Sequence, residues 1–281
     1  SNGKYEVAYA YGKIDSPIGG MTNLEWSEKN NIALLDSIQE VVDKSDRLIV
    51  LSPDNPEMHE ELCEIPLKSK KLVYVDKTFA PDRATAERIF AHAKANDTKC
   101  YSSSALRFST ELKNVKKEDI HKIYSEGPGT YEMYSIHQIE PIVSLMGCRA
   151  KRVMFIGEAD HPAMLIEFED GRLAQMYQTF DSPFRLTLNK NDNKSDILEI
   201  KSDYFRLFLA ELIRFFDTGE ILVRQHSEIT VDQSSVTIQE AVDLHLFLTV
   251  RQCLHHTSHS CVQGLAVTTA RQHSDSLHRR I

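Results

Sequence analysis

The first third of the chain alternates between short apolar runs and segments in which apolar residues recur at helical spacing. The runs are four to eight residues long, as in buried strands, and the segments between them have one apolar face. Strands spaced by helices predict βαβ units and a parallel sheet. The expected strands are Tyr5–Tyr11, Leu48–Leu51, Leu72–Val75 and Lys99–Ser103, and the expected helices are Asn31–Lys44, Pro56–Leu67 and Asp82–Asn96, with a loop over Gly12–Asn23.

The pattern changes after about residue 105, where several strand-like runs follow one another directly. Asp170-Gly171 lies between two of these runs and is a strong signal for a hairpin turn. Consecutive strands with flanking helices predict an antiparallel sheet that has its helices on one face. The expected strands are Arg152–Ile156, Ala163–Glu169, Leu173–Thr179, Phe184–Asn189 and Asp196–Lys201, and the expected helices are Tyr131–Met146, Ser202–Asp217 and Thr237–Leu254.

These patterns together predict the α/β class. A Rossmann-type parallel sheet over residues 1–105 is followed by an α+β domain over 106–254, which has a large, open, mostly antiparallel sheet. The tail 255–281 has little apolar periodicity and is rich in histidine, serine and arginine, so we expect it to be disordered.

Composition narrows the class of function. The chain has 281 residues, 41% hydrophobic and 26% charged, which is typical of a globular protein. A net charge of −8 argues against a nucleic-acid partner. No apolar run approaches the length of a membrane span, so we expect no membrane partner. The five scattered cysteines fit a reducing cytoplasm better than a disulfide framework.

Lys77 is the most informative candidate residue. It follows the strand Leu72–Val75 directly after Asp76, at the edge of the sheet where ligands of open α/β folds bind. A lysine in a partly dry cleft can exchange a proton with a substrate hydroxyl, and Asp76 is in a position to orient it. The alternative is a solvated loop lysine with a weak surface ion pair.

The segment Ser52-Pro53-Asp54-Asn55-Pro56 follows the preceding strand. Asp54 or Asn55 suits a helix N-cap and Pro56 suits the first turn, so a helix N-terminus there is available to a phosphate or a nicotinamide amide. The alternative is an ordinary loop between a strand and a helix.

His137 shares one face of its expected helix with Tyr134 and Glu140. This set suits a polyol or a proton relay, and the alternative is a histidine at the rim of a helix interface. Two further clusters are not assigned to a site. Ser102-Ser103-Ser104 is interpreted as a strand end. The histidines around His255–His259 fit no standard zinc pattern, so we expect no metal.

Three segments together resemble the Gfo/Idh/MocA family of NAD(P)-dependent oxidoreductases. Asp46–His59 is similar to the family's strand with a Ser/Thr-Pro turn and a histidine, and Lys71–Thr78 is similar to its strand ending in Glu-Lys-Pro. Gly129–Gly147, with His137, resembles the first long helix of the family's C-terminal domain.

The resemblance implies hydride transfer between NAD or NADP and a sugar- or cyclitol-like substrate. It implies that Lys77 and His137 are catalytic and that Arg107 lies near the site. We expect Arg107 to bind the substrate, together with Tyr134, which shares the helix face of His137. It also implies a homodimer or higher oligomer through the C-terminal sheet. The cofactor side would consist of Ser52, Pro53, Asn55, His59, Asp76 and Lys77.

The chain departs from the family pattern at several points. It contains no GxGxxG, and Tyr5–Tyr11 aligns with the second family strand, so we expect the N-terminal Gly-rich strand, turn and helix to be lacking. Met133 stands where members often carry an aspartate, and Gly12-Lys13 stands where an acidic ribose ligand is expected. Two hypotheses follow: an oxidoreductase, or a non-catalytic relative that acts as a binding or assembly protein.

Overall fold

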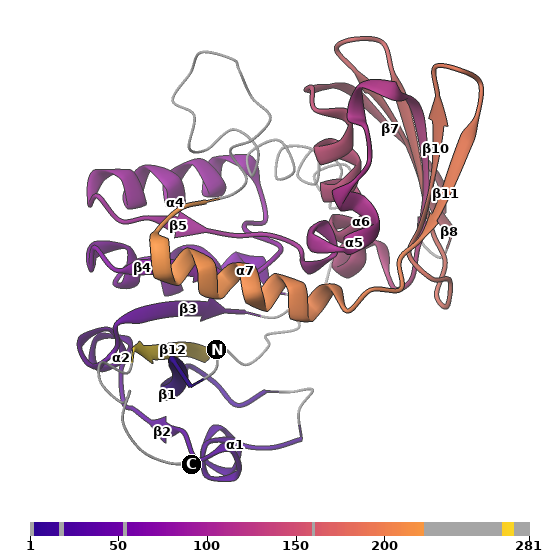
Figure 1. Ribbon diagram of the computed structural model, residues 1–281. Coiled ribbons are helices and arrows are strands. Elements are labelled where there is room, and N and C mark those ends of the chain that lie inside the picture. The colour runs from indigo at the N-terminus through magenta and orange to yellow at the C-terminus, as the bar shows by residue number, and fades with distance from the viewer. Residues whose placement is uncertain (1–2, 17–19, 53–54, 159–160, 222–265, 273–281) are drawn as a thin grey trace, which may run out of the picture.

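The computed structural model describes residues 3–16, 20–52, 55–158, 161–221 and 266–272. Two sheets, each with its own hydrophobic core, form the molecule (Figure 1). This arrangement is the α/β class with a Rossmann-like first sheet and a larger mixed second sheet. Within the described ranges, no helix has both the length and the apolar content that crossing a bilayer requires.

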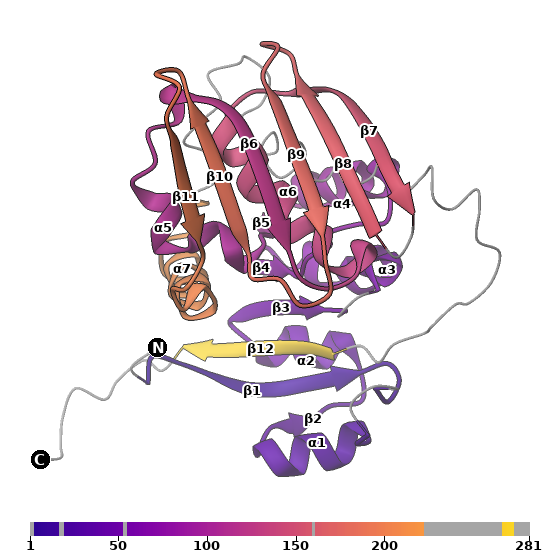
Figure 2. The ribbon, with the colours of Figure 1, turned by 90° about the vertical axis from the view of Figure 1, so that its right-hand side faces the viewer.

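The first sheet is parallel except for one strand. Its order is β2-β1-β12-β3-β4-β5, and β12 runs antiparallel to both of its neighbours (Figure 2). In the Rossmann order 3-2-1-4-5-6, β12 stands at the place of the central first strand. The bounds are β1 Tyr5–Gly12, β2 Ala33–Leu34, β3 Arg47–Leu51, β4 Leu72–Val75, β5 Cys100–Tyr101 and β12 Ala266–Gln272.

The strand β12 corrects the expectation of disorder for residues 266–272, which belong to the tail. Its register pairs Thr268 with Ala10 on one side and with Ile49 on the other. A segment of Val, Thr and Ala between two apolar strands gains ladder hydrogen bonds on both edges, which outweighs its weak periodicity. The other tail residues, the His255–His259 cluster and the expected helix Thr237–Leu254 lie outside the described residues.

The single helix expected over Asn31–Lys44 is wrong. Asn31 adopts a left-handed conformation, φ 53°, which ends the helix α1, Asn23–Asn30. Ser37 then starts α2, Ile38–Lys44, by accepting the Glu40 N–H at 3.2 Å. The helix α1 was itself missed, although Thr22 and Glu25 form a capping box at its start.

The remaining helices of the first region follow the predictions closely. The expected helix Pro56–Leu67 is α3, His59–Cys63, with 3₁₀ turns at Pro56–Met58 and Pro66–Lys68. The helix α4, Arg83–Ala95, begins where Asp82 accepts the Thr85 N–H at 2.8 Å. The helix α7, Tyr204–Thr218, lies within the range expected for the second domain but packs Phe208, Leu212, Phe215 and Phe216 into the core of the first sheet.

The second sheet has the order β11-β10-β6-β9-β8-β7, and all of its pairs are antiparallel except β6 with β9. The helix α6, Tyr131–Met146, covers its inner face, and the short α5, Thr110–Lys113, lies nearby (Figure 2). The bounds are β6 Ile120–Gly127, β7 Ala150–Glu158, β8 His161–Phe168, β9 Leu173–Gln178, β10 Arg185–Lys190 and β11 Ser195–Glu199.

The central strand β6 was missed from the sequence. Its buried residues Ile120 and Ile123 are three positions apart, because the register with β10 shifts at Lys190. An irregular pairing of this kind breaks the period of two by which a strand is recognised.

The Thr268→Pro variant tests the position of β12. A proline removes one ladder N–H from a strand that is paired on both sides, so we expect the free energy of unfolding to fall by about 2 kcal/mol or more. Urea unfolding measures this loss. Thr268→Ala, which keeps the N–H, is the control, and equal stability of the two variants would contradict the pairing.

Candidate functional site

The carboxyl ends of β3, β4 and β5 bring three polar segments to one edge of the first sheet. Ser52 follows β3 and is buried, and its Oγ donates to the Asn55 carbonyl at 2.6 Å, which closes the turn. Asn55 is also buried and occupies the N-cap position of the 3₁₀ turn without a side-chain capping bond. Pro53 lies outside the described residues. This edge is where a parallel sheet binds its ligands.

His59 is fully buried beneath this edge. Its Nδ1 lies 2.9 Å from the carbonyl of Phe79, which can only accept, so Nδ1 carries the proton. Nε2 is then a buried acceptor for which the described residues offer no hydrogen-bond partner. Burial, with a contribution from the charge of Lys77, lowers the pKa of His59 to about 4, so the ring is neutral near pH 7.

Lys77 reaches from the end of β4 in the first sheet to the helix that covers the second sheet. Its Nζ lies 3.5 Å from the backbone carbonyl of Met133 on α6. Asp76, the preceding residue, accepts from the Tyr74 hydroxyl at 3.4 Å. The peptide between Lys77 and Thr78 is cis, and Thr78 is buried. The ammonium group therefore lies between the sheet edge and the first turn of α6.

His137 lies on α6, one turn after Met133. Its Nδ1 is 2.8 Å from the Ser104 hydroxyl, and its ring meets Tyr134 and Phe184 edge-on with centroids 5.4 and 5.9 Å apart. Burial and then the charge of Lys77 lower the pKa of His137 to about 3. The same lysine thus acts on both histidines, which shows that the three groups share one electrostatic environment.

The shared face of Tyr134, His137 and Glu140 predicted from helical spacing is confirmed by their contacts. Tyr134 touches His137, and Glu140 points to the same segment after β5 that His137 contacts. Tyr134 is 40% exposed, so it remains accessible from outside.

Arg107 forms an ion pair with Glu140. The guanidinium Nη1 lies 3.1 Å from the carboxylate, and the two side chains are 14% and 6% exposed. Glu140 also accepts from the Ser103 hydroxyl at 2.6 Å and from the backbone N–H of Ser104. Sequence reasoning treated Ser103 and Ser104 only as a strand end; the signal for their role was that they follow the last strand of the first sheet, opposite α6.

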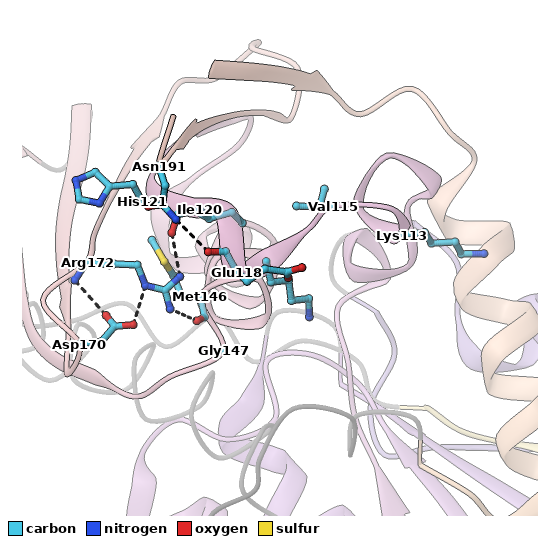
Figure 3. A pocket seen from close by; sticks show the side chains of 11 residues that line it. Lys113, Val115, Glu118, Ile120, His121, Met146, Gly147, Asp170, Arg172 and Asn191 are labelled. Carbon is cyan, nitrogen blue, oxygen red and sulfur yellow. Dashed lines mark hydrogen bonds and ion pairs between the residues drawn. The ribbon is translucent and has the colours of Figure 1, made fainter. Parts of the chain in front are cut away.

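A separate cavity of about 790 Å³ lies at the opposite end of α6 and contains none of the predicted site residues (Figure 3). Two of its cations are engaged with the helix end: Arg172 donates to the Met146 carbonyl, and Lys117 donates to the Ser144 carbonyl at 2.8 Å. Burial and the charge of Arg107 lower the pKa of Lys117 to about 8. Cations at a helix C-terminus stabilise it, so we assign this cluster to capping.

The described residues fit a dinucleotide in part. The buried Nε2 of His59, an acceptor without a partner among the described residues, and the buried Ser52 and Asn55 after β3 suit the amide of a nicotinamide ring. The pyrophosphate end has no counterpart in the described ranges, because β12 begins at the ligand edge instead of ending there in a Gly-rich turn.

No protein-family model matches the chain, and no curated protein matches it. Solved structures do match. UDP-N-acetylglucosamine 3-dehydrogenase GnnA from Acidithiobacillus ferrooxidans has a TM-score of 0.65 at 12% identity, with 81% of this chain and 85% of that chain covered. Apo scyllo-inositol dehydrogenase from Lactobacillus casei has a TM-score of 0.62 at 18% identity, with 82% and 85% covered. GenD2 from gentamicin A biosynthesis, in complex with NAD, has a TM-score of 0.64 at 12% identity, with 88% and 87% covered. At these identities the likeness shows a shared fold.

The buried neutral histidines predict a loss of stability in acid. The unfolded chain protonates His59 near its ordinary pKa of 6.5, whereas the folded chain does so only near 4. The stability that comes from keeping His59 neutral is therefore fully present above about pH 6.5 and is lost as the pH falls towards 4. At about pH 5 the free energy of unfolding is lower by about 2 kcal/mol.

Urea unfolding at about pH 7 and about pH 5 measures this loss. Between the two pH values, we expect the free energy of unfolding to fall by about 2 kcal/mol less in His59→Asn than in the parent. Asparagine keeps a donor for the Phe79 carbonyl but does not titrate. The exposed His121 supplies the control variant, His121→Asn. A parent protein whose stability does not change over this window would contradict the burial of a neutral ring.

Proposed function

We propose that the chain is an oxidoreductase of the Gfo/Idh/MocA type, which transfers a hydride between NAD or NADP and a hydroxyl or carbonyl carbon of a sugar- or cyclitol-like substrate. The observation that carries the proposal is that Lys77, after β4 of the first sheet, and His137, on the helix α6 that covers the second sheet, come together at the carboxyl edge of the first sheet. The dehydrogenases of the same fold support it.

The roles follow from the chemistry of each group. Lys77 is the group that exchanges a proton with the substrate oxygen, because an ammonium can donate and its free amine can accept. His137, beside it, holds that oxygen. Tyr134 presents an accessible hydroxyl next to His137, which suits a second hydroxyl of a polyol. Arg107 completes the substrate side, with its charge balanced by Glu140.

The cofactor end would be held by Ser52, Pro53, Asn55, His59 and Asp76. When bound, the nicotinamide accepts or supplies the hydride. GenD2, a neighbour of the same fold, is in complex with NAD, and a neighbouring biliverdin reductase from Synechocystis is in complex with NADP+. Both nucleotides are therefore candidates for this chain.

A non-catalytic relative is the second candidate. The antiparallel β12 at the place of the first Rossmann strand favours it, because a strand in this direction delivers no turn and helix N-terminus to the pyrophosphate. Met133, in place of the aspartate that the family often carries, points the same way. Such a protein would keep the cluster of Lys77 and His137 and use it for binding.

The outer face of the second sheet is the surface that we propose for a homodimer. Large apolar side chains are exposed across four of its strands: Tyr124, Met154, Ile156, Tyr177 and Ile197. Cross-strand ion pairs such as Arg185 with Glu126 at 2.6 Å lie among them. In a two-fold dimer the same face of a second copy would meet this one, so apolar side chains can pack on apolar side chains and charged groups can meet opposite charges. The free thiols Cys63 and Cys100 support a reducing, cytoplasmic location.

The Lys77→Ala variant tests the catalytic role. We expect NAD(P)H affinity, measured by fluorescence titration, to stay nearly unchanged and turnover of sugar alcohols to fall by about 10²-fold or more. Lys122→Ala, on the second sheet, is the control. Equal turnover of Lys77→Ala and the parent would remove Lys77 from the mechanism, and a parent that binds neither nucleotide would favour the non-catalytic relative.

Sedimentation velocity tests the dimer. We expect the parent to sediment as a dimer at micromolar concentrations and Tyr177→Lys, at the centre of the exposed face, to weaken association about 10-fold or more. Phe205→Lys, on the exposed side of α7, is the matched control. A parent that sediments as a monomer would overturn the proposed interface.

A further inference from the structure

The imidazole of His137 has one hydrogen-bond partner among the described residues, the Ser104 hydroxyl. The distance from Oγ to Nδ1 is 2.8 Å, and Ser104 is 1% exposed. A neutral imidazole carries its proton on one nitrogen only, and the partner of the other nitrogen decides which one. The direction of this single hydrogen bond therefore sets the chemistry that His137 offers to a ligand.

The surroundings of Ser104 fix that direction. Its Oγ is the N-cap of the 3₁₀ turn Ala105–Phe108 and accepts the N–H of Leu106 at 3.3 Å. If Nδ1 carried the proton, the Oγ would accept a second time, and the hydroxyl hydrogen would have no acceptor in the described part of the chain. A buried donor without a partner is costly. The hydroxyl instead donates to Nδ1, which places the ring proton on Nε2. Ser104 is buried whereas His137 is only half-buried, so solvent or a ligand can accept from Nε2.

Glu140 holds Ser104 in this position. The carboxylate accepts the backbone N–H of Ser104, and it lies one helical turn after His137 on the same helix. Ser103 and Arg107 bind the same carboxylate at 2.6 and 3.1 Å. The donor to the imidazole and the imidazole itself are thus anchored to one rigid element, which keeps their distance fixed.

We propose that Ser104 is a positioning residue that holds neutral His137 as the Nε2–H tautomer, so that the ring offers a ligand oxygen a hydrogen-bond donor and no basic lone pair. The role in turnover rests on the proposed function; the tautomer does not. His137 then stabilises charge on the substrate oxygen while keeping its own proton, and proton exchange with that oxygen is left to Lys77. The low pKa of His137 agrees with a ring that stays neutral.

Nitrogen-15 NMR of the full chain with labelled histidine tests the proposal at about pH 7. The loss of signals in His137→Gln assigns the ring. We expect the parent to show a protonated Nε2 and an unprotonated Nδ1, and Ser104→Ala to show a mixture of both tautomers. Ser104→Thr, which keeps the hydroxyl, restores the parent pattern. Ser103→Ala is the matched control, because it loses a bond to Glu140 but touches no histidine nitrogen.

A parent spectrum with the proton on Nδ1 overturns the proposal, and so does a Ser104→Ala spectrum identical to that of the parent. The parent spectrum alone is decisive if Ser104→Ala does not fold. In a preparation that oxidises a sugar alcohol, Ser104→Ala lowers kcat by about 10-fold without changing NAD(P)H affinity, while Lys122→Ala on β6 leaves kcat unchanged. If the protein shows the expected tautomer but no turnover, the positioning role of Ser104 is retained and the oxidoreductase function is rejected.

Discussion

The buried carboxylate of Glu140 is the contact on which the rest of the site depends. It is 6% exposed and accepts from Ser103, Ser104 and Arg107, so its charge is compensated on every side described. These donors all follow the last strand of the first sheet, whereas Glu140 belongs to the helix that covers the second sheet. Removal of one partner leaves a buried charge unpaired, which is far more costly than the pair is favourable. These contacts therefore fix the register of α6 against the segment that follows β5.

Because α6 is a continuous helix, the position of Glu140 also fixes the residues towards both of its ends. One turn before Glu140, the same helix presents His137, and one turn earlier still, the Met133 carbonyl faces Lys77. At its far end, Arg172 and Lys117 satisfy the last carbonyls, which fixes the helix along its axis. A shift of α6 by even one residue would separate Lys77 from His137, because neighbouring helical positions point about 100° apart.

Those features that arise from local pattern were predictable from the sequence. The strand Leu72–Val75 and the helix Tyr131–Met146 have the expected bounds, since each has an unbroken apolar run or face. The strand β6 was missed because its register shift hides the alternation, and the break between α1 and α2 was missed because Asn31 adopts a left-handed conformation that apolar spacing does not encode. The bond from Ser104 to His137 joins positions 33 residues apart, so no local pattern reveals it.

The direction of β12 affects the pyrophosphate side of a dinucleotide site but not the nicotinamide side. A parallel strand at the centre of the first sheet would end at the ligand edge, where a Gly-rich turn and a helix N-terminus can meet phosphate. An antiparallel strand satisfies the same ladders of β1 and β3, so the sheet gains its hydrogen bonds either way. The hydrogen bonding of the sheet therefore permits either direction of the central strand, whereas phosphate binding requires the parallel one. The contacts described above for Lys77 and His137 are made by the ends of β4 and β5 and by α6, and β12 takes no part in them.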